Sequence, residues 1–168
     1  MPEDSEKEKL DQLRGLTDQA FEGIKAEMKR LKLDRGKAAY RRPLDLLEEA
    51  YLAIRYPVAA KGGASLPLLA LRGAIDRSVE ELVRRSPAQQ KGEKRRDRIL
   101  SIGLHCGKKG LALAHFDTLA AEDEAVNREL GKGNRVSPER PDLAKQFLRA
   151  AQFLRALLAS VDEALVKP

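Results

Sequence analysis

Residues 143–165 read LAKQFLRAAQFLRALLASVDEAL, and they carry the most regular apolar pattern in the chain. Apolar side chains recur here at steps of three and four, which is the spacing of one face of an α-helix. The stripe consists of Leu143, Phe147, Ala151, Leu154, Leu158, Val161 and Leu165. A helix with so long an apolar face needs neighbouring helices to bury it. The pattern therefore predicts a final helix that packs within a helical bundle.

Three segments in the first half of the chain also show helical patterns. The first begins at a capping box, Ser5–Glu8, and continues for about thirty residues towards Gly36, a residue type that often ends helices. The second begins at Pro43, because proline is well tolerated in the first helical turn. The third begins at Ser65 and ends at Ser86–Pro87.

Three helices are predicted for the second half. The fourth begins after Gly92 and ends at Gly107, and the fifth covers about residues 117–130. The last helix begins with Ser137 as its cap and Pro138 in its first turn. No convincing strand and no internal repeat is present in the sequence.

The composition of the 168-residue chain agrees with an all-α fold. It is 42% hydrophobic and 35% charged, with three Tyr, four Phe and no Trp. The core must therefore consist mainly of Leu, Ala, Ile and Val, and leucine and alanine favour helix over strand. We expect a single α-helical domain over residues 1–168, a bundle of about five or six helices. Flexible loops are expected near 57–66, 86–92 and 131–138.

Cysteine content and hydropathy favour a soluble cytoplasmic protein. Cys106 is the only cysteine, so no intramolecular disulfide forms, which fits a reducing compartment. The first ten residues, MPEDSEKEKL, are acidic and lack the apolar core of a signal peptide. No apolar run approaches the roughly 20 residues that span a bilayer, so no membrane partner is expected.

The positive charge of the chain is concentrated in two blocks. The net charge is +6, and residues 84–110 hold nine Lys and Arg against two acidic residues. A second block, residues 25–42, holds eight Lys and Arg against two acidic residues. Concentrated positive charge is typical of surfaces that bind polyanions, although a helical surface with mixed charges is the alternative. Whether the two blocks share one face depends on the packing of the helices.

The densest part of the first block predicts a nucleic-acid contact. Its candidate phosphate-binding residues are Lys91, Lys94, Arg95, Arg96, Lys108 and Lys109. Lysine and arginine neutralise phosphates without reading sequence, and this binding weakens as salt rises. The nearest aromatic residue is Phe116, so stacking on unpaired bases is disfavoured and contacts to the backbone are expected. The sequence does not distinguish RNA from DNA.

Arg98 and His105 form a second candidate site. They are seven residues apart, so on a helix they lie within about 20° of each other and about 10 Å apart along the axis. The pair resembles the Arg-x(4–6)-His signature of the HEPN superfamily, small all-helical proteins of bacterial defence and toxin systems. The resemblance implies metal-independent RNA cleavage at a dimer interface. Arg98 would hold the scissile phosphate and His105 would transfer the proton of the attacking 2′-hydroxyl. Ile99 follows Arg98 at a position that is usually polar in HEPN proteins.

No metal or cofactor site is predicted. His105, Cys106, His115 and Asp117 lie near one another in sequence but lack a recognised zinc spacing. A buried cysteine that behaves as a small apolar residue explains Cys106 better.

The resulting prediction is a non-enzymatic basic helical bundle that acts as an accessory or assembly subunit and contacts nucleic acid through its Lys/Arg-rich central helix. Its expected protein partners are further copies of itself or another protein. Two alternatives stay open. One is the HEPN-type RNase that uses Arg98 and His105, and the other is a pure protein–protein interaction or oligomerisation module.

Overall fold

The computed structural model describes residues 2–35, 42–56, 65–86, 94–133 and 140–167, and these residues form six α-helices. The helices are α1 (Pro2–Arg30), α2 (Pro43–Arg55), α3 (Ser65–Arg85), α4 (Arg95–Cys106), α5 (Leu113–Gly133) and α6 (Arg140–Ala159), followed by a short 3-10 turn, η1 (Glu163–Leu165). Within the described ranges the sole β-type contact is a single bridge between Gly107 and Val161. The all-α prediction is confirmed.

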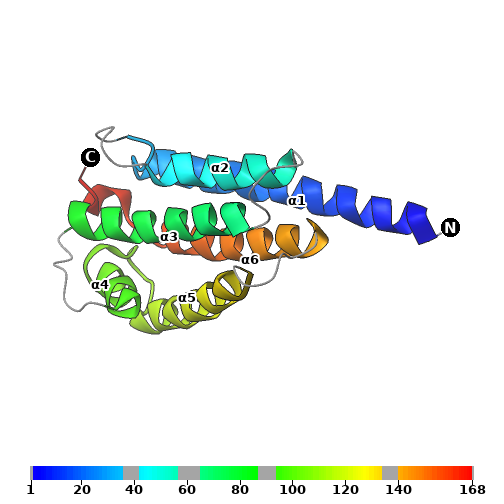
Figure 1. Cartoon of the computed structure of the whole chain (residues 1–168). Coiled ribbons are helices and arrows are strands. Elements are labelled where there is room, and N and C mark those ends of the chain that lie inside the picture. Colours follow the sequence, from blue (N-terminus) through cyan, green and yellow to red (C-terminus); the bar gives the residue numbers. More distant parts are fainter. Residues whose placement is uncertain (1, 36–41, 57–64, 87–93, 134–139, 168) are drawn as a thin grey trace.

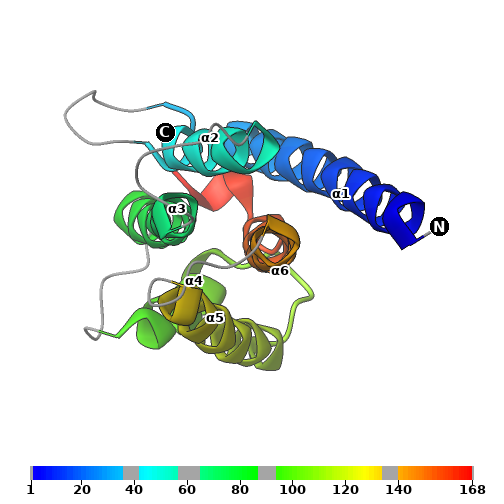
Figure 2. The same cartoon turned by 45° about the vertical axis from the view of Figure 1, so that its right-hand side comes forward.

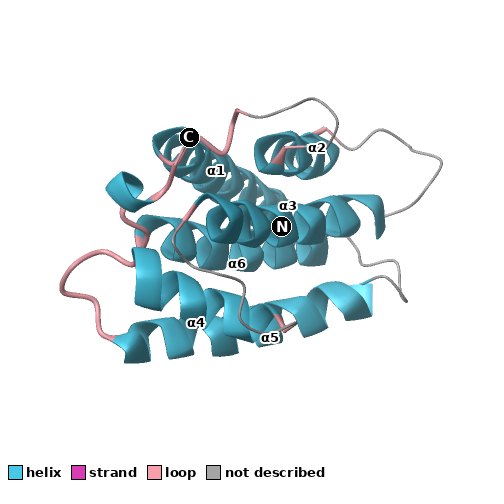
Figure 3. Ribbon diagram, turned by 90° about the vertical axis from the view of Figure 1, so that its left-hand side faces the viewer, coloured by secondary structure: helices cyan, strands magenta, loops and turns pink. Residues whose placement is uncertain are grey.

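The helices form three layers of two (Figures 1 and 2). α1 and α2 make the first layer, α3 and α6 the middle layer, and α4 and α5 the third, as the view along another direction also shows (Figure 3). α6 contacts α1 on one side and α5 on the other, while α3 contacts α2 and α4. One cluster of buried apolar side chains extends through all three layers. The predicted stripe of α6 lies in it, with Phe147, Leu154 and Leu158 fully buried.

The structure departs from the predicted apolar stripe only at the C-terminal end of the stripe. The helix ends at Ala159, because the amides of Ser160 and Val161 bond to carbonyls three residues back and tighten the last turn. Val161 is buried through its bridge with Gly107, outside the helix. Leu165, predicted to continue the stripe, is 41% exposed, and Val166 is buried in its place.

Other predicted boundaries need smaller corrections. α1 has 29 residues, as expected, but it begins at Pro2, so Ser5 lies inside the helix and is not its cap. α5 begins at Leu113, four residues before the predicted start at 117.

Part of the predicted loops belongs to helices, since α3 includes residues 65–66 and α5 includes residues 131–133. The rest of the predicted loops lies largely outside the described residues. Gly36, Ser137 and Pro138, which were predicted to mark helix ends, also lie outside them.

α1 and α2 are joined by an aromatic and polar contact. The rings of Phe21 and Tyr51 stack with their centroids 4.1 Å apart. The Tyr51 hydroxyl donates to Asp18 at 2.5 Å, and Arg55 pairs with the same carboxylate at 3.2 Å. Burial, together with the hydrogen bond to Asp18, raises the pKa of Tyr51 to about 12. The contact holds α2 against α1 just after Thr17, the first fully buried residue of α1.

α1 ends in a Schellman turn that has lysine where glycine is usual. The Leu33 amide bonds to the Met28 carbonyl at 2.8 Å, and the Lys32 amide bonds to the Lys29 carbonyl at 3.1 Å. Lys32 has a φ of 58°, the left-handed conformation that residues with a Cβ adopt at a cost. Met28 and Leu33 are both fully buried, which is the apolar contact expected of this motif.

We therefore predict that Lys32→Gly raises the free energy of unfolding by about 1 kcal/mol, because glycine adopts a positive φ without strain. Lys32→Ala is the control, since it also removes the side chain but keeps the strained conformation. Urea unfolding with an unchanged m-value measures both. A glycine variant no more stable than the alanine variant would contradict the prediction.

Candidate nucleic-acid interface

The ends of α1, α3, α4 and α6 meet at one end of the bundle. The segment after α4 hydrogen-bonds to the segment after α6, through Asp162 N–H to Cys106 C=O at 2.8 Å and Lys108 N–H to Ser160 C=O at 2.9 Å. The last residue of α3 is tied to the C-terminal segment, since the Arg85 carbonyl accepts from the Lys167 amide at 2.7 Å. Helix C-termini carry unpaired carbonyls and partial negative charge. This end of the bundle therefore requires hydrogen-bond donors and positive charge.

Arg30, in the last turn of α1, supplies donors for α6. Its Nη2 donates to the Leu158 carbonyl at 2.8 Å and its Nη1 donates to the Val161 carbonyl at 3.0 Å. Its Nε donates to Glu27 at 2.7 Å, so one carboxylate on the same helix fixes the guanidinium. We call this arrangement the Arg30 cap.

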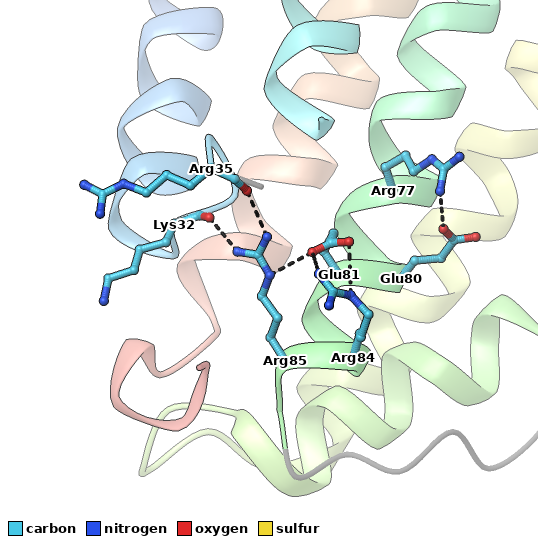
Figure 4. A network of polar contacts seen from close by, with 7 residues as sticks. All are labelled: Lys32, Arg35, Arg77, Glu80, Glu81, Arg84 and Arg85. Carbon is cyan, nitrogen blue, oxygen red and sulfur yellow. Dashed lines mark hydrogen bonds and ion pairs between the residues drawn. The ribbon is translucent and has the colours of Figure 1, made fainter. Parts of the chain in front are cut away.

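Arg85, at the end of α3, donates hydrogen bonds to two backbone carbonyls of the turn after α1 (Figure 4). Its Nη1 donates to the Lys32 carbonyl at 2.6 Å and its Nη2 donates to the Arg35 carbonyl at 2.9 Å. Its Nε lies 2.7 Å from Glu81, and its side chain is only 9% exposed. We call this arrangement the Arg85 cap.

Glu81 holds the Arg85 cap in place. Arg84 also pairs with this carboxylate, at 2.7 Å. Burial alone would raise the pKa of Glu81, but the hydrogen bond from Arg84 and the charges of Arg85 and Arg84 outweigh it, so the pKa of Glu81 is lowered. The carboxylate therefore stays ionised at neutral pH and keeps both guanidinium groups in position.

The Arg85 cap also brings the two basic blocks together. The carbonyls of Lys32 and Arg35 receive its hydrogen bonds, while the side chains of both residues point away from Glu81 (Figure 4). Residues 25–42 and 84–110 thus meet at the end of the bundle. Only parts of the two blocks meet there, since Lys94 and Arg96 lie at the other end of α4.

We define the basic end as five cations that surround this meeting point, four of them exposed and one, Lys32, partly buried. They are Lys32, Arg35, Lys108, Lys109 and Lys167. Two acidic groups in this region are occupied, because Glu81 holds two arginines and Asp162 caps η1 by accepting from the Ala164 amide. Asp34 lies 4.0 Å from Arg35, a loose pair in which the Asp34 carboxylate is partly buried and its Oδ1 has no hydrogen-bond partner among the described residues.

The structure divides the predicted phosphate-binding residues of the fourth helix. Lys94 and Arg96 are exposed at the start of α4, and Lys108 and Lys109 are exposed after its end. Lys91 lies outside the described residues. The structure thus separates these exposed lysines and arginines into two groups along the length of the helix.

Arg95 is occupied within the fold. Its side chain is 16% exposed and pairs with Asp76 of α3 and with Asp123 of α5, the latter at 2.8 Å. The Asp123 side chain is 4% exposed, so the pair is largely removed from water. Arg95 therefore cross-links three helices, and we leave it out of the exposed binding surface.

Arg98 and His105 lie on the unbroken helix α4, and both are partly buried. The Arg98 Nε is buried and has no hydrogen-bond partner among the described residues.

Cys106 is packed in the core, and His115 takes part in a hydrogen bond within the fold. Cys106 is fully buried, and burial raises the pKa of its thiol to about 11, so it stays protonated and unreactive. Ser160 donates its hydroxyl proton to the Ala156 carbonyl at 2.7 Å, so Nε2 of His115 donates to the Ser160 oxygen, also at 2.7 Å. No three His, Cys, Asp or Glu side chains in the described ranges are grouped so that they could hold a metal ion.

The sequence placed Lys32 and Arg35 in the second basic block without naming them as site residues, and it did not identify Lys167 or the structural roles of Arg30 and Arg85. A signal for the two arginines was present, because basic residues end both α1 and α3. The backbone carbonyls that these side chains bond are 50 or more residues away, so the sequence pattern alone did not identify them.

The chain matches no protein-family model, and neither the curated proteins nor the solved structures contain a similar chain. Among the helices of the described residues, none is long and apolar enough to cross a membrane.

The Arg85 cap makes a stability prediction. We expect Arg85→Ala to lower the free energy of unfolding by about 3 kcal/mol, because it leaves two carbonyls without their charged donor and removes one of the two guanidinium groups that pair with the partly buried Glu81. Arg85→Lys should recover only part of this loss, since one ammonium group cannot reach both carbonyls and Glu81 in the same geometry.

Arg84→Ala is the matched control, because Arg84 pairs with the same Glu81 but is 66% exposed. We expect it to change the free energy of unfolding by less than about 1 kcal/mol. Chemical denaturation measures all three variants. A lysine variant as stable as the parent would show that the two carbonyl contacts of Arg85 contribute little.

Proposed function

We propose that the protein is a non-enzymatic accessory or assembly subunit that contacts the nucleic-acid backbone through the basic end and the exposed cations of α4. One observation carries the proposal. The basic end contains exposed cations from several separate parts of the chain. Arg30 and Arg85 already donate hydrogen bonds to the carbonyls of the adjacent helix ends. The exposed cations are therefore not needed as caps, and they are available to a polyanion.

The spread of these cations favours an extended ligand over a small anion. α4 has 12 residues, so its length of about 18 Å separates Lys94 and Arg96 from Lys108 and Lys109. A single phosphate cannot contact both groups. A nucleic-acid duplex, with phosphates along its whole length, can.

The aromatic residues favour a duplex over unpaired bases. Phe116, the aromatic residue nearest in sequence to Lys108 and Lys109, is 1% exposed and packs on Gly103 of α4. It offers no face on which a base can stack. Contacts to phosphates, without reading of base sequence, are the binding mode that these residues support.

Salt-dependent binding tests this proposal. We expect the protein to bind duplex RNA or DNA with an affinity that falls steeply between low and moderate salt. Lys108→Glu with Lys109→Glu should weaken binding at least about tenfold and reduce the slope of log affinity against log salt by about 2. Fluorescence anisotropy with labelled duplexes measures both quantities.

The matched control is Arg128→Glu with Lys145→Glu, which makes the same change in net charge at two exposed positions of α5 and α6. It should weaken binding much less. Equal losses in both double variants would show that only total charge matters, and an affinity that does not depend on salt would contradict the proposal outright.

The HEPN-type RNase is a second candidate, and the buried Arg98 Nε without a partner favours it. In this case Arg98→Ala and His105→Ala should each abolish cleavage of RNA, because each removes one of the two groups that act on the phosphate and the 2′-hydroxyl. Both variants should keep the helical circular dichroism of the parent. A parent protein that cleaves none of a varied set of RNAs would contradict this candidate.

A pure protein–protein interaction module is the third candidate, and exposed leucines favour it. Leu104, Leu111 and Leu113 are 68%, 40% and 51% exposed, and they lie close in sequence to Lys108 and Lys109. A protein partner would cover such side chains. The anisotropy titration separates this candidate from the first, since it requires no binding of nucleic acid.

A further inference from the structure

The first half of α1 extends beyond the bundle (Figures 1 and 2). Apart from the partly buried Leu10, Leu13 and Arg14, residues 3–16 are exposed, and the first fully buried residue of the helix is Thr17. A side chain added at Gly15 would meet no other atom within 4 Å. We call residues 2–16 the overhang. Since the helix continues without a break from Pro2, the overhang presents a helical surface that no other described helix covers.

The overhang continues the apolar stripe of α1. Leu10 and Leu13 stand at helical spacing before Thr17, Phe21 and Ile24, which face the interior of the bundle. Leu16, beside this stripe, is 47% exposed. The same side of one helix is therefore buried by neighbouring helices over its second half, whereas over its first half Leu10 and Leu13 are only partly buried and no helix of the described residues packs on them.

We propose that the overhang pairs with the overhang of a second copy of this chain, in antiparallel orientation. The distribution of charge supports this choice. Residues 3–8 carry four acidic side chains and one lysine, whereas residues 9–16 carry Lys9 and Arg14 against Asp11. Antiparallel pairing puts the acidic half of each copy against the basic half of the other, while parallel pairing puts the two acidic halves together.

A twofold axis near Leu10 completes the arrangement. Leu10 of one copy then meets Leu10 of the other, and Glu6 of each copy lies opposite Arg14 of the other. Such a self-complementary interface is the commonest kind in homo-oligomers. The overhang is about 21 Å long, so the interface is small and a dissociation constant in the micromolar range is expected.

Sedimentation of the full chain, without nucleic acid, tests the proposal. The parent should shift from monomer to dimer between about 1 and about 100 μM. Leu10→Glu with Leu13→Glu should stay monomeric over this range. The matched control is Gln12→Glu with Gln19→Glu, which adds the same charge at exposed positions on the other side of α1 and should dimerise like the parent.

A charge exchange tests the orientation. Glu6→Arg and Arg14→Glu should each weaken the dimer about tenfold, and the two together should restore it. A parent that is monomeric at all concentrations would overturn the proposal, and so would a dimer that survives Leu10→Glu with Leu13→Glu. A double exchange no better than the single variants would overturn the antiparallel pairing. Lys108→Glu with Lys109→Glu should dimerise like the parent, so loss of nucleic-acid binding and loss of the dimer are separate results.

Discussion

Helices whose C-termini lie together create a local excess of unpaired carbonyls and negative charge. The packing of this bundle depends on the side chains that donate hydrogen bonds to those carbonyls. α1, α3, α4 and α6 all end on one side of the molecule, and two arginines bond to the backbone carbonyls there. Arg30 joins the end of α1 to the end of α6, and Arg85 joins the end of α3 to the turn after α1. Each is held by a carboxylate on its own helix, Glu27 or Glu81. The relative positions of three helices from two layers are thereby coupled at one end of the bundle.

The same constraint explains much of the charge pattern. The Lys and Arg residues of a basic block can bond to groups inside the fold or stay exposed on its surface, and both occur in this protein. Arg30, Arg85 and Arg95 are used inside the molecule, against carbonyls or against Asp76 and Asp123. The cations of the basic end remain after these internal needs are met, and they are the ones that support the proposed contact with nucleic acid.

The sequence predicted the fold well and the candidate site only in part. Steps of three and four along α6 predicted a helix that needed partners, and its stripe is buried as far as Leu158. The pattern could not show that the helix ends at Ala159, because the bridge between Gly107 and Val161 joins segments that are 54 residues apart.

The site was harder to predict for the same reason. Lys108 and Lys109 were found from local charge density, whereas Lys32 and Lys167 join them through contacts between segments far apart in the sequence, among them those of Arg85. Arg95 looked like its neighbours in sequence, and only the positions of Asp76 and Asp123 show that it is occupied.

The two proposed surfaces lie at opposite parts of α1, since the overhang precedes Thr17 and the basic end surrounds the turn that follows Arg30. A dimer formed through the overhangs would leave both basic ends uncovered, and two linked sites bind a long polyanion more tightly than one. The arginine caps hold together the helix ends that position the basic end. NMR of the arginine side chains tests these caps most directly. The account predicts slow rotation and separate Nη resonances for Arg30 and Arg85, and averaged resonances for the exposed Arg35 and Arg96. Averaged Nη resonances for all four arginines would contradict it.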